Sequence, residues 1–321
     1  MKAAVYYQTG SPDVLRYEDV PDPVCDANNN VVIRVEAISI EGGDTHNRLG
    51  GDLATVPHIV GYQCAGTIVE VHASVTDRHV GQRVVATMMW GSHAELVAVP
   101  SLITWPIPDG GDIVKCACIP VAFGTADDCL FEFGHLQAGE TVLIQAGAGG
   151  VGVAAIQLAK RAGATTIATA SSLERLAPLR ALGLDHAIDY SQQGWVDDVR
   201  KITNGVGVDL VVDSVNGPVL AGSVASLKYR GRAITVGSAG RDPQLFDVSA
   251  LMMNNQSLTG VFFGAEIINP RVTAMVQRHV DDVASGALEV LVDRTFPLAD
   301  AAAAHAFIES RQAIGRVVLV P

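Results

Sequence analysis

The 321-residue sequence lacks an excess of positive charge, a long hydrophobic run and a paired set of cysteines. Its formal net charge is −12, so the phosphate attraction that dominates binding to nucleic acid or to an anionic membrane would be reversed, and neither partner is expected. No run of 18 apolar residues could span a bilayer, and Met1–Tyr7 has the pattern of a strand rather than of a signal peptide. The five cysteines form no even disulfide framework, which agrees with the reducing cytoplasm as the expected location.

Two different patterns of apolar residues divide the chain. Hydrophobic residues make up 49% of it, enough for two cores, and its length suggests two domains of roughly 150 residues each. The first 120 residues contain short β-rich runs separated by Gly and Pro, a pattern typical of an antiparallel, barrel-like unit. These runs are Val31–Ala37, Gly66–Val71, Gln82–Ala86 and Ala94–Val99.

A strand, a glycine-rich turn and a helix follow one another between residues 141 and 160. Gly147, Gly149 and Gly152 have the spacing that lets a chain turn sharply, admit a pyrophosphate against bare backbone and start a helix packed close to a sheet. The alternative is an ordinary glycine-rich turn, but the strand before it and the Ala-rich helix after it favour a dinucleotide site. The residues predicted to bind the cofactor here are Gly147, Gly149, Gly150, Val151 and Gly152.

Strands and helices continue to alternate after this turn. With Thr141–Gln145 and Thr165–Ala170, six strands are predicted, which implies a doubly wound parallel sheet with its ligand at the carboxyl ends of the strands. The other four are Asp185–Ile188, Val208–Val212, Arg232–Val236 and Leu258–Phe263, and helices are expected at Leu173–Leu182, Trp195–Ile202 and Val219–Leu227. Beyond residue 266, helices are predicted over Pro270–Ser285 and Ala299–Ser310, with strands at Glu289–Phe296 and Val317–Val320.

The end of the second strand indicates which cofactor binds. An NAD site usually has Asp or Glu there, whereas this chain has Ser171 and Ser172, with Arg175 one helical turn further on. Hydroxyl and guanidinium groups favour the 2′-phosphate of NADPH. A capping box between Ser171 and Glu174 is the alternative for those two residues, and it leaves Arg175 unexplained.

Short motifs in order along the whole chain resemble the medium-chain dehydrogenase/reductase superfamily, in particular its zinc-independent NADPH:quinone oxidoreductase branch, the zeta-crystallin-like group. The matching segments are Lys2-Ala-Ala-Val, Gly10-x-Pro12-Asp-Val-Leu, Gly61-x-x-x-Ala65-Gly66, Gly81-Gln-Arg-Val, Ala94-Glu95, Gly124-Thr125-Ala126, the Gly147 turn, Leu182-Gly183-x-Asp185, Asp213-Ser214-Val215 and Gly315-Arg316-Val-Val-Leu.

The resemblance implies a central Rossmann domain over 122–265 and a GroES-like substrate domain formed from 1–121 and 266–321. It also implies a homodimer joined through the strand near Leu258–Phe263. The family pattern places further residues beside NADPH, namely Thr125, Val215, Val236, Ser238, Phe263, Tyr190 and Arg316. For Tyr190, a half-buried aromatic at a strand end is the alternative.

Zinc-dependent relatives carry Cys three residues before an Asp and then a Gly-His-Glu segment, so that thiolate and imidazole hold a catalytic zinc. This chain has Glu41 ahead of Asp44, and Tyr62 followed by Gln63, at those positions. No metal is therefore expected. Other sets of thiols and imidazoles are interpreted as packing or loop residues, namely His46, His58 and Cys64, and Cys116 with Cys118.

Without zinc, hydride transfer needs an acceptor that is already electrophilic, such as a quinone or an α,β-unsaturated carbonyl. Glu41, His46 and Tyr62 are the candidate catalytic residues, because they could donate a proton or a hydrogen bond to the acceptor's oxygen. For Glu41 and Asp44, a polar turn whose carboxylates cap the following helix is an equal alternative. Quinone reduction is the predicted function, with enoyl or alkenal double-bond reduction and non-catalytic NADPH binding as the alternatives.

Overall fold

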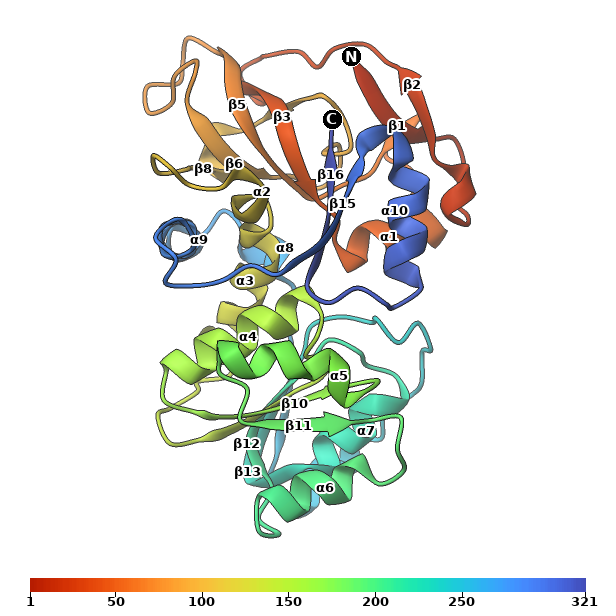
Figure 1. Cartoon of the computed structure of the whole chain (residues 1–321), viewed down its shortest axis with the longest axis vertical. Coiled ribbons are helices and arrows are strands. Elements are labelled where there is room, and N and C mark those ends of the chain that lie inside the picture. The colour runs from red at the N-terminus through yellow and green to blue at the C-terminus, as the bar shows by residue number, and fades with distance from the viewer. The chain divides into compact units, whose positions relative to one another are not determined.

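The computed structural model describes every residue from Met1 to Pro321, and the chain folds into two compact units. One unit combines Met1–Val121 with Gly264–Pro321, and the other is Ala122–Phe263. Figure 1 shows the red N-terminal and blue C-terminal segments within the same unit. The chain enters the second unit within helix α3 (Ile119–Asp127). The chain returns to the first unit at Gly264, two residues before the boundary expected at residue 266.

The second unit is built on a six-stranded parallel sheet with the order β11-β10-β9-β12-β13-β14. The strands are β9 (Thr141–Ile144), β10 (Thr165–Ala170), β11 (His186–Asp189), β12 (Val208–Asp213), β13 (Leu227–Thr235) and β14 (Ser257–Gly260). The connecting helices include α4 (Gly150–Arg161), α5 (Leu173–Leu176), α6 (Trp195–Ile202) and α7 (Pro218–Ala225). All six predicted strands are present, and the predicted doubly wound fold is confirmed.

The first unit contains the antiparallel strands that the short β-rich runs predicted, and one parallel pair, β15 with β16, extends their sheet. Its main sheet has the order β15-β16-β3-β5-β6-β8, with β7 also paired to β3, and a smaller sheet joins β2, β1 and β4. The strands are β1 (Lys2–Tyr6), β2 (Arg16–Asp19), β3 (Val31–Ser39), β4 (His58–Ile59), β5 (Gln63–Val71), β6 (Arg83–Thr87), β7 (Leu96–Val99), β8 (Thr104–Pro106), β15 (Val292–Pro297) and β16 (Arg316–Val320). Alternate apolar residues of these strands form its core.

The C-terminal strand completes this unit. Val318 and Leu319 of β16 pair with Ser39 and Ile38 of β3, which confirms the return of the chain's end to its beginning. Helices α1 (Gly42–Gly50), α2 (Ile113–Cys116), α9 (Pro270–Ala284) and α10 (Ala301–Glu309) also belong to this unit, while α8 (Phe263–Glu266) starts at the unit boundary. None of the helices combines the length and apolar character needed to span a membrane.

Two predicted elements differ from the structure. The helix expected over Leu173–Leu182 is α5 followed by a 3₁₀ segment, Ala177–Leu182, because Pro178 has no backbone N–H to continue an α-helical ladder. The strand expected over Leu258–Phe263 ends at Gly260, and Phe263 already starts α8.

Candidate active site

The glycine turn between β9 and α4 leaves bare backbone at the start of a helix. A Cβ on Gly147 would lie 2.6 Å from that of Ala168, and a Cβ on Gly152 would lie 2.5 Å from the carbonyl oxygen of Ala146, so both positions require close approach. A Cβ on Gly149, the N-cap residue of α4, would meet only that same oxygen, at 3.3 Å. The turn therefore has the cradle that a pyrophosphate needs, with free amides of the first helical turn, including Gly150 and Val151.

The predicted adenosine-phosphate residues lie at the ends of the two neighbouring strands. Ser171 follows β10, and Tyr190, 43% exposed, follows β11 with its N–H donating to the carbonyl oxygen of Ala170 at 3.0 Å. The capping box between Ser171 and Glu174 is wrong, because Ser172 is the N-cap residue of α5 and Arg175 takes the third helical position. The residues that remain for a phosphate are thus hydroxyls and a guanidinium, which are chemically suited to it.

Asp213, to which the sequence analysis gave no role, links the carboxyl ends of β12 and β13 by hydrogen bonds. The buried carboxylate of Asp213 accepts hydrogen bonds from the N–H groups of Val215 and Asn216, both at 2.8 Å, and from the Ser223 hydroxyl at 2.8 Å. The N–H of Val236 donates to the Asp213 carbonyl oxygen at 2.9 Å. Asp213 therefore shapes the loops that carry Val215, Val236 and the exposed Ser238.

Thr125 lies in α3, where it is 6% exposed. The neighbouring Gly124 accommodates the ring of Phe263, because a Cβ at Gly124 would overlap that ring. Thr125 and Phe263, both predicted to contact the nicotinamide end of the cofactor, therefore lie near each other within the second unit.

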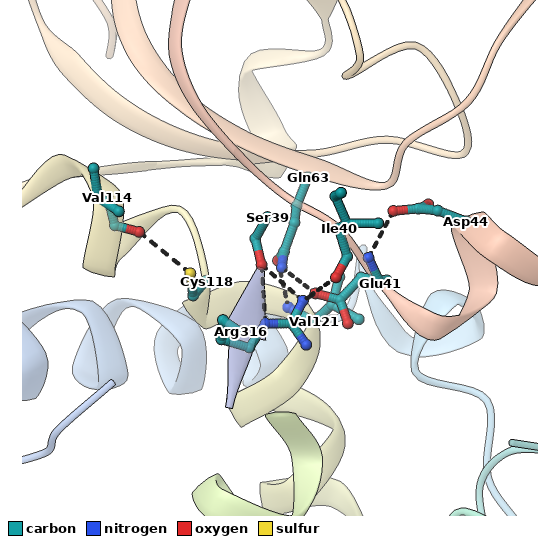
Figure 2. Close-up of polar contacts among 9 residues, drawn as sticks. All are labelled: Ser39, Ile40, Glu41, Asp44, Gln63, Val114, Cys118, Val121 and Arg316. Atoms are coloured by element: carbon teal, nitrogen blue, oxygen red, sulfur yellow. Dashed lines mark hydrogen bonds and ion pairs between the residues drawn. The ribbon is translucent and has the colours of Figure 1, made fainter. Parts of the chain in front are cut away.

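Glu41 belongs to a buried polar cluster in the first unit, drawn in Figure 2. Its carboxylate forms an ion pair with Arg316 of β16 and accepts a hydrogen bond from the amide of Gln63. Arg316 also donates to Ser39 Oγ at 2.7 Å and to the Ile40 carbonyl oxygen at 2.7 Å. Its guanidinium is thus engaged inside this unit, and its expected contact with the cofactor stays a prediction.

The same cluster extends to Val121, where the N-terminal segment of the first unit ends. The Gln63 Oε1 atom accepts a hydrogen bond from the Val121 N–H at 2.9 Å, and the Cys118 thiol donates to the Val114 carbonyl oxygen at 3.2 Å. Burial raises the pKa of Glu41, although the contacts with Arg316, Ser39 and Gln63 oppose that shift. With one oxygen held by two partners, Glu41 is placed to hold the chain in position rather than to exchange protons with solvent.

The other two predicted catalytic residues are His46, within α1, and Tyr62, which directly precedes β5 and contacts α1 through Asn47. His46 is exposed, whereas Tyr62 is partly buried and its hydroxyl accepts a hydrogen bond from Asn47 Nδ2 at 2.6 Å. Asp44 is fully buried, and its Oδ2 atom accepts the Glu41 N–H at 2.7 Å, so this carboxyl does cap the helix as the alternative interpretation expected. Burial raises the pKa of Asp44 well above its ordinary value.

The donor chemistry at the zinc positions of the related enzymes does not fit a zinc ion. Glu41 is already paired with a guanidinium and an amide, and Tyr62 and Gln63 offer a protonated phenol and a neutral side chain instead of imidazole. No group of three or more His, Cys, Asp or Glu side chains in the chain is arranged to hold a metal. Four of the five cysteines, Cys64, Cys116, Cys118 and Cys129, are buried.

Known protein families and structures match the chain over nearly its whole length. A zinc-binding dehydrogenase model matches residues 150–280, and an alcohol dehydrogenase GroES-like domain model matches residues 27–109. A 2-haloacrylate reductase from Burkholderia sp is 34% identical over 337 residues, which cover 99% of this chain and 98% of the relative.

Solved structures agree with this relationship. A mycobacterial protein complexed with NADPH has a TM-score of 0.93 and 32% identity, covering 100% of both chains. The Escherichia coli quinone oxidoreductase complexed with NADPH has a TM-score of 0.94 and 25% identity, again over 100% of both chains. The chain therefore belongs to the medium-chain dehydrogenase/reductase superfamily, in its zinc-independent quinone oxidoreductase branch.

Proposed function

We propose that this protein is an NADPH-dependent reductase that transfers hydride, without zinc, to a quinone or a similarly electrophilic carbonyl compound. The observation that carries the proposal is the engagement of Glu41 by Arg316 and Gln63, because it leaves no ligand set to polarise an alcohol or a simple ketone. An acceptor reduced here must be electrophilic by itself. Quinones and conjugated carbonyls meet that condition.

The second unit offers the residues that would hold the cofactor. The amides of the glycine turn suit the pyrophosphate, while Ser171, Ser172 and Arg175 suit the 2′-phosphate. Two complexes of related structures with NADPH support this assignment. When bound, NADPH supplies the hydride, and the protein's part is to orient it toward the acceptor.

A conjugated double bond is the second candidate for the acceptor. The 34% identical relative is named a 2-haloacrylate reductase, and its substrate class has a C=C bond next to a carboxyl group. The hydroxyl of Tyr62 supports both acceptors equally well, since each develops negative charge on a carbonyl-type oxygen. The two candidates therefore differ in the acceptor and share one chemistry.

NADPH oxidation measured with a panel of acceptors tests the proposal. We expect turnover with 1,4-benzoquinone, with cyclohex-2-enone or with 2-chloroacrylate, and a much lower rate with saturated ketones and alcohols. NADPH binding without turnover of any acceptor would instead support the non-catalytic alternative.

The same preparation tests the metal assignment. Because Glu41, Tyr62 and Gln63 stand at the zinc-ligand positions, elemental analysis should find no stoichiometric zinc, and a chelator should leave the rate unchanged. One tightly bound zinc per chain would contradict this prediction.

A further inference from the structure

The hydrogen-bond partner of the Tyr62 hydroxyl determines what this group can offer to an acceptor. The Tyr62 ring lies against the first turn of α1 at Gly43, where a Cβ would overlap the ring atom Cε2. Four residues further along α1, Asn47 Nδ2 donates to the phenolic oxygen at 2.6 Å. Positions i and i+4 share one face of a helix. Gly43 thus makes room for the ring, and Asn47 holds its hydroxyl end.

The direction of this hydrogen bond leaves the hydrogen of Tyr62 free for another partner. A phenol can accept through its oxygen and can donate a single hydrogen. Because Asn47 occupies the oxygen as a donor, the Tyr62 hydrogen points elsewhere. Burial raises the pKa of Tyr62 to about 12, so the hydrogen is retained at neutral pH.

The titratable groups that face Tyr62 are Asp44 and Glu41 at the start of α1 and Tyr6 of β1. The Asp44 Oδ2 atom holds the Glu41 N–H, while its Oδ1 atom has no hydrogen-bond partner. The Glu41 carboxylate is paired with Arg316. Neither carboxyl therefore takes the hydrogen of Tyr62.

We propose that Asn47 is a positioning residue. By donating to the Tyr62 oxygen, it leaves the Tyr62 hydroxyl to donate its hydrogen to the carbonyl oxygen of the acceptor. The inference rests on the proposed reductase function. In an enone, a C–H bond forms at the β-carbon with the hydride of NADPH, the C=C pair moves to the α-carbon and oxygen, and NADPH is oxidised to NADP⁺. The Tyr62 O–H stabilises the charge that gathers on oxygen, and solvent then supplies the proton that completes the product.

Two substitutions of Asn47 separate this role from simple packing. In Asn47→Asp at pH 7.5, the new carboxylate can only accept, so it takes the Tyr62 hydrogen away from the acceptor. We expect kcat with cyclohex-2-enone to fall about 10- to 100-fold, as in Tyr62→Phe. Asn47→Ala leaves the hydrogen available, and its loss should stay below about fivefold. A packing role predicts the opposite order, because Asp is closer in shape to Asn than Ala is.

The pH profile supplies a second readout. Below about pH 4 the carboxyl introduced by Asn47→Asp binds a proton and can donate to Tyr62 again, so its rate relative to the native protein should recover. The matched control is Asn28→Asp, which makes the same change at an exposed position and should follow the native profile. NADPH affinity should be unchanged in all variants.

The carbonyl stretching frequency of cyclohex-2-enone bound together with NADP⁺ tests the hydrogen bond without turnover. It should be lowered in the native protein and in Asn47→Ala, and closer to that of the free ketone in Tyr62→Phe and Asn47→Asp at pH 7.5. Native-like kcat and frequency in Asn47→Asp, or Asn47→Ala as the most impaired variant, would overturn the proposal. If no acceptor is reduced, the proposed function fails, and the frequency still decides the direction of this hydrogen bond. Failure of the enone to bind would overturn both.

Discussion

Glu41 shows how one distant partner changes what a carboxylate can do. From the sequence it was a candidate proton donor next to Asp44 and His46, but in the fold it is 5% exposed and paired with Arg316, 275 residues away along the chain. His46 is exposed and has no buried ion pair of this kind. Among the three predicted catalytic residues, Tyr62 keeps the geometry best suited to touch an acceptor.

Glu41→Gln should therefore affect stability more than catalysis. The substitution leaves the buried guanidinium of Arg316 without its carboxylate, and we expect the free energy of unfolding to fall by about 3 kcal/mol. The kcat of the folded variant should change less than about tenfold. Urea unfolding and steady-state kinetics measure the two effects.

The control for this substitution is Glu289→Gln, which breaks a partly exposed pair with Lys115 and should cost less than about 1 kcal/mol. A thousandfold loss of kcat in Glu41→Gln with unchanged stability would instead make Glu41 the proton donor and reverse the roles assigned here.

We propose that Arg175 distinguishes the two nicotinamide cofactors. It is partly buried in α5, which directly follows Ser171 and Ser172 at the end of β10. Arg175→Ala should weaken NADPH binding by about 2 kcal/mol, because a charge-assisted contact with the 2′-phosphate is lost, and should leave NADH binding nearly unchanged. Titration of both cofactors by fluorescence measures this, with the exposed Arg180→Ala as the matched control. Equal losses for both cofactors would contradict the assignment.

At the scale of elements, local sequence patterns were sufficient to predict a helix or strand wherever an apolar run was bounded by turn residues. Helix α6 was predicted with its bounds, and all six parallel strands were found. The signal is strongest in β12, whose residues are all buried and form a nearly continuous apolar run. The start of α5 at Leu173 was predicted, but the capping box from Ser171 was wrong, because either of two adjacent serines could serve as the N-cap and the structure uses Ser172. The Glu41–Arg316 pair and the Asn47–Tyr62 hydrogen bond could not be predicted, since each depends on how separate elements pack.

One further packing feature links three elements of the first unit. Arg48 of α1 donates through Nε to His305 Nδ1 of α10 at 3.3 Å, and His305 Nε2 lies 3.1 Å from Nε2 of His93, which precedes β7. Because His305 accepts at Nδ1, its hydrogen is on Nε2 and is donated to His93. Both imidazoles are fully buried and therefore neutral.

This pair makes the first unit sensitive to acid. Burial lowers the pKa of His93 to about 3, whereas the unfolded chain binds the proton below roughly pH 6.5. The stability contributed by the neutral imidazole is complete above that pH and is lost as the pH falls toward 3, by about 2 kcal/mol at pH 5. His93→Gln should therefore flatten the decline in unfolding free energy between pH 7 and pH 5. The exposed His79→Gln is the control and should leave the decline unchanged. An equally steep decline in His93→Gln would contradict the assignment.

At the scale of the whole molecule, the sheet of the second unit ends in a strand with one unpaired edge. Strand β14 pairs only with β13, so half of its backbone N–H and C=O groups have no strand partner. Exposed edge strands tend to pair with another chain. Large apolar side chains nearby are also exposed, namely Tyr229, Val248, Met252, Met253 and Phe262. Such a surface favours an interface between two copies of the chain.

We expect a homodimer in which β14 pairs antiparallel with the same strand of a second copy around a twofold axis, so that one sheet continues through both chains. Light scattering coupled to size-exclusion chromatography should give twice the 33.6 kDa mass of the chain.

Phe262, 68% exposed beside β14, should contribute to that interface, and Phe262→Asp should shift the population toward monomer because a carboxylate would be desolvated there. Val206→Asp makes the same kind of change at a site 62% exposed in the loop before β12, and it should leave the mass unchanged. A native protein that stays monomeric at micromolar concentration, or a dimer that withstands Phe262→Asp together with Met253→Asp, would show that this edge is not the interface.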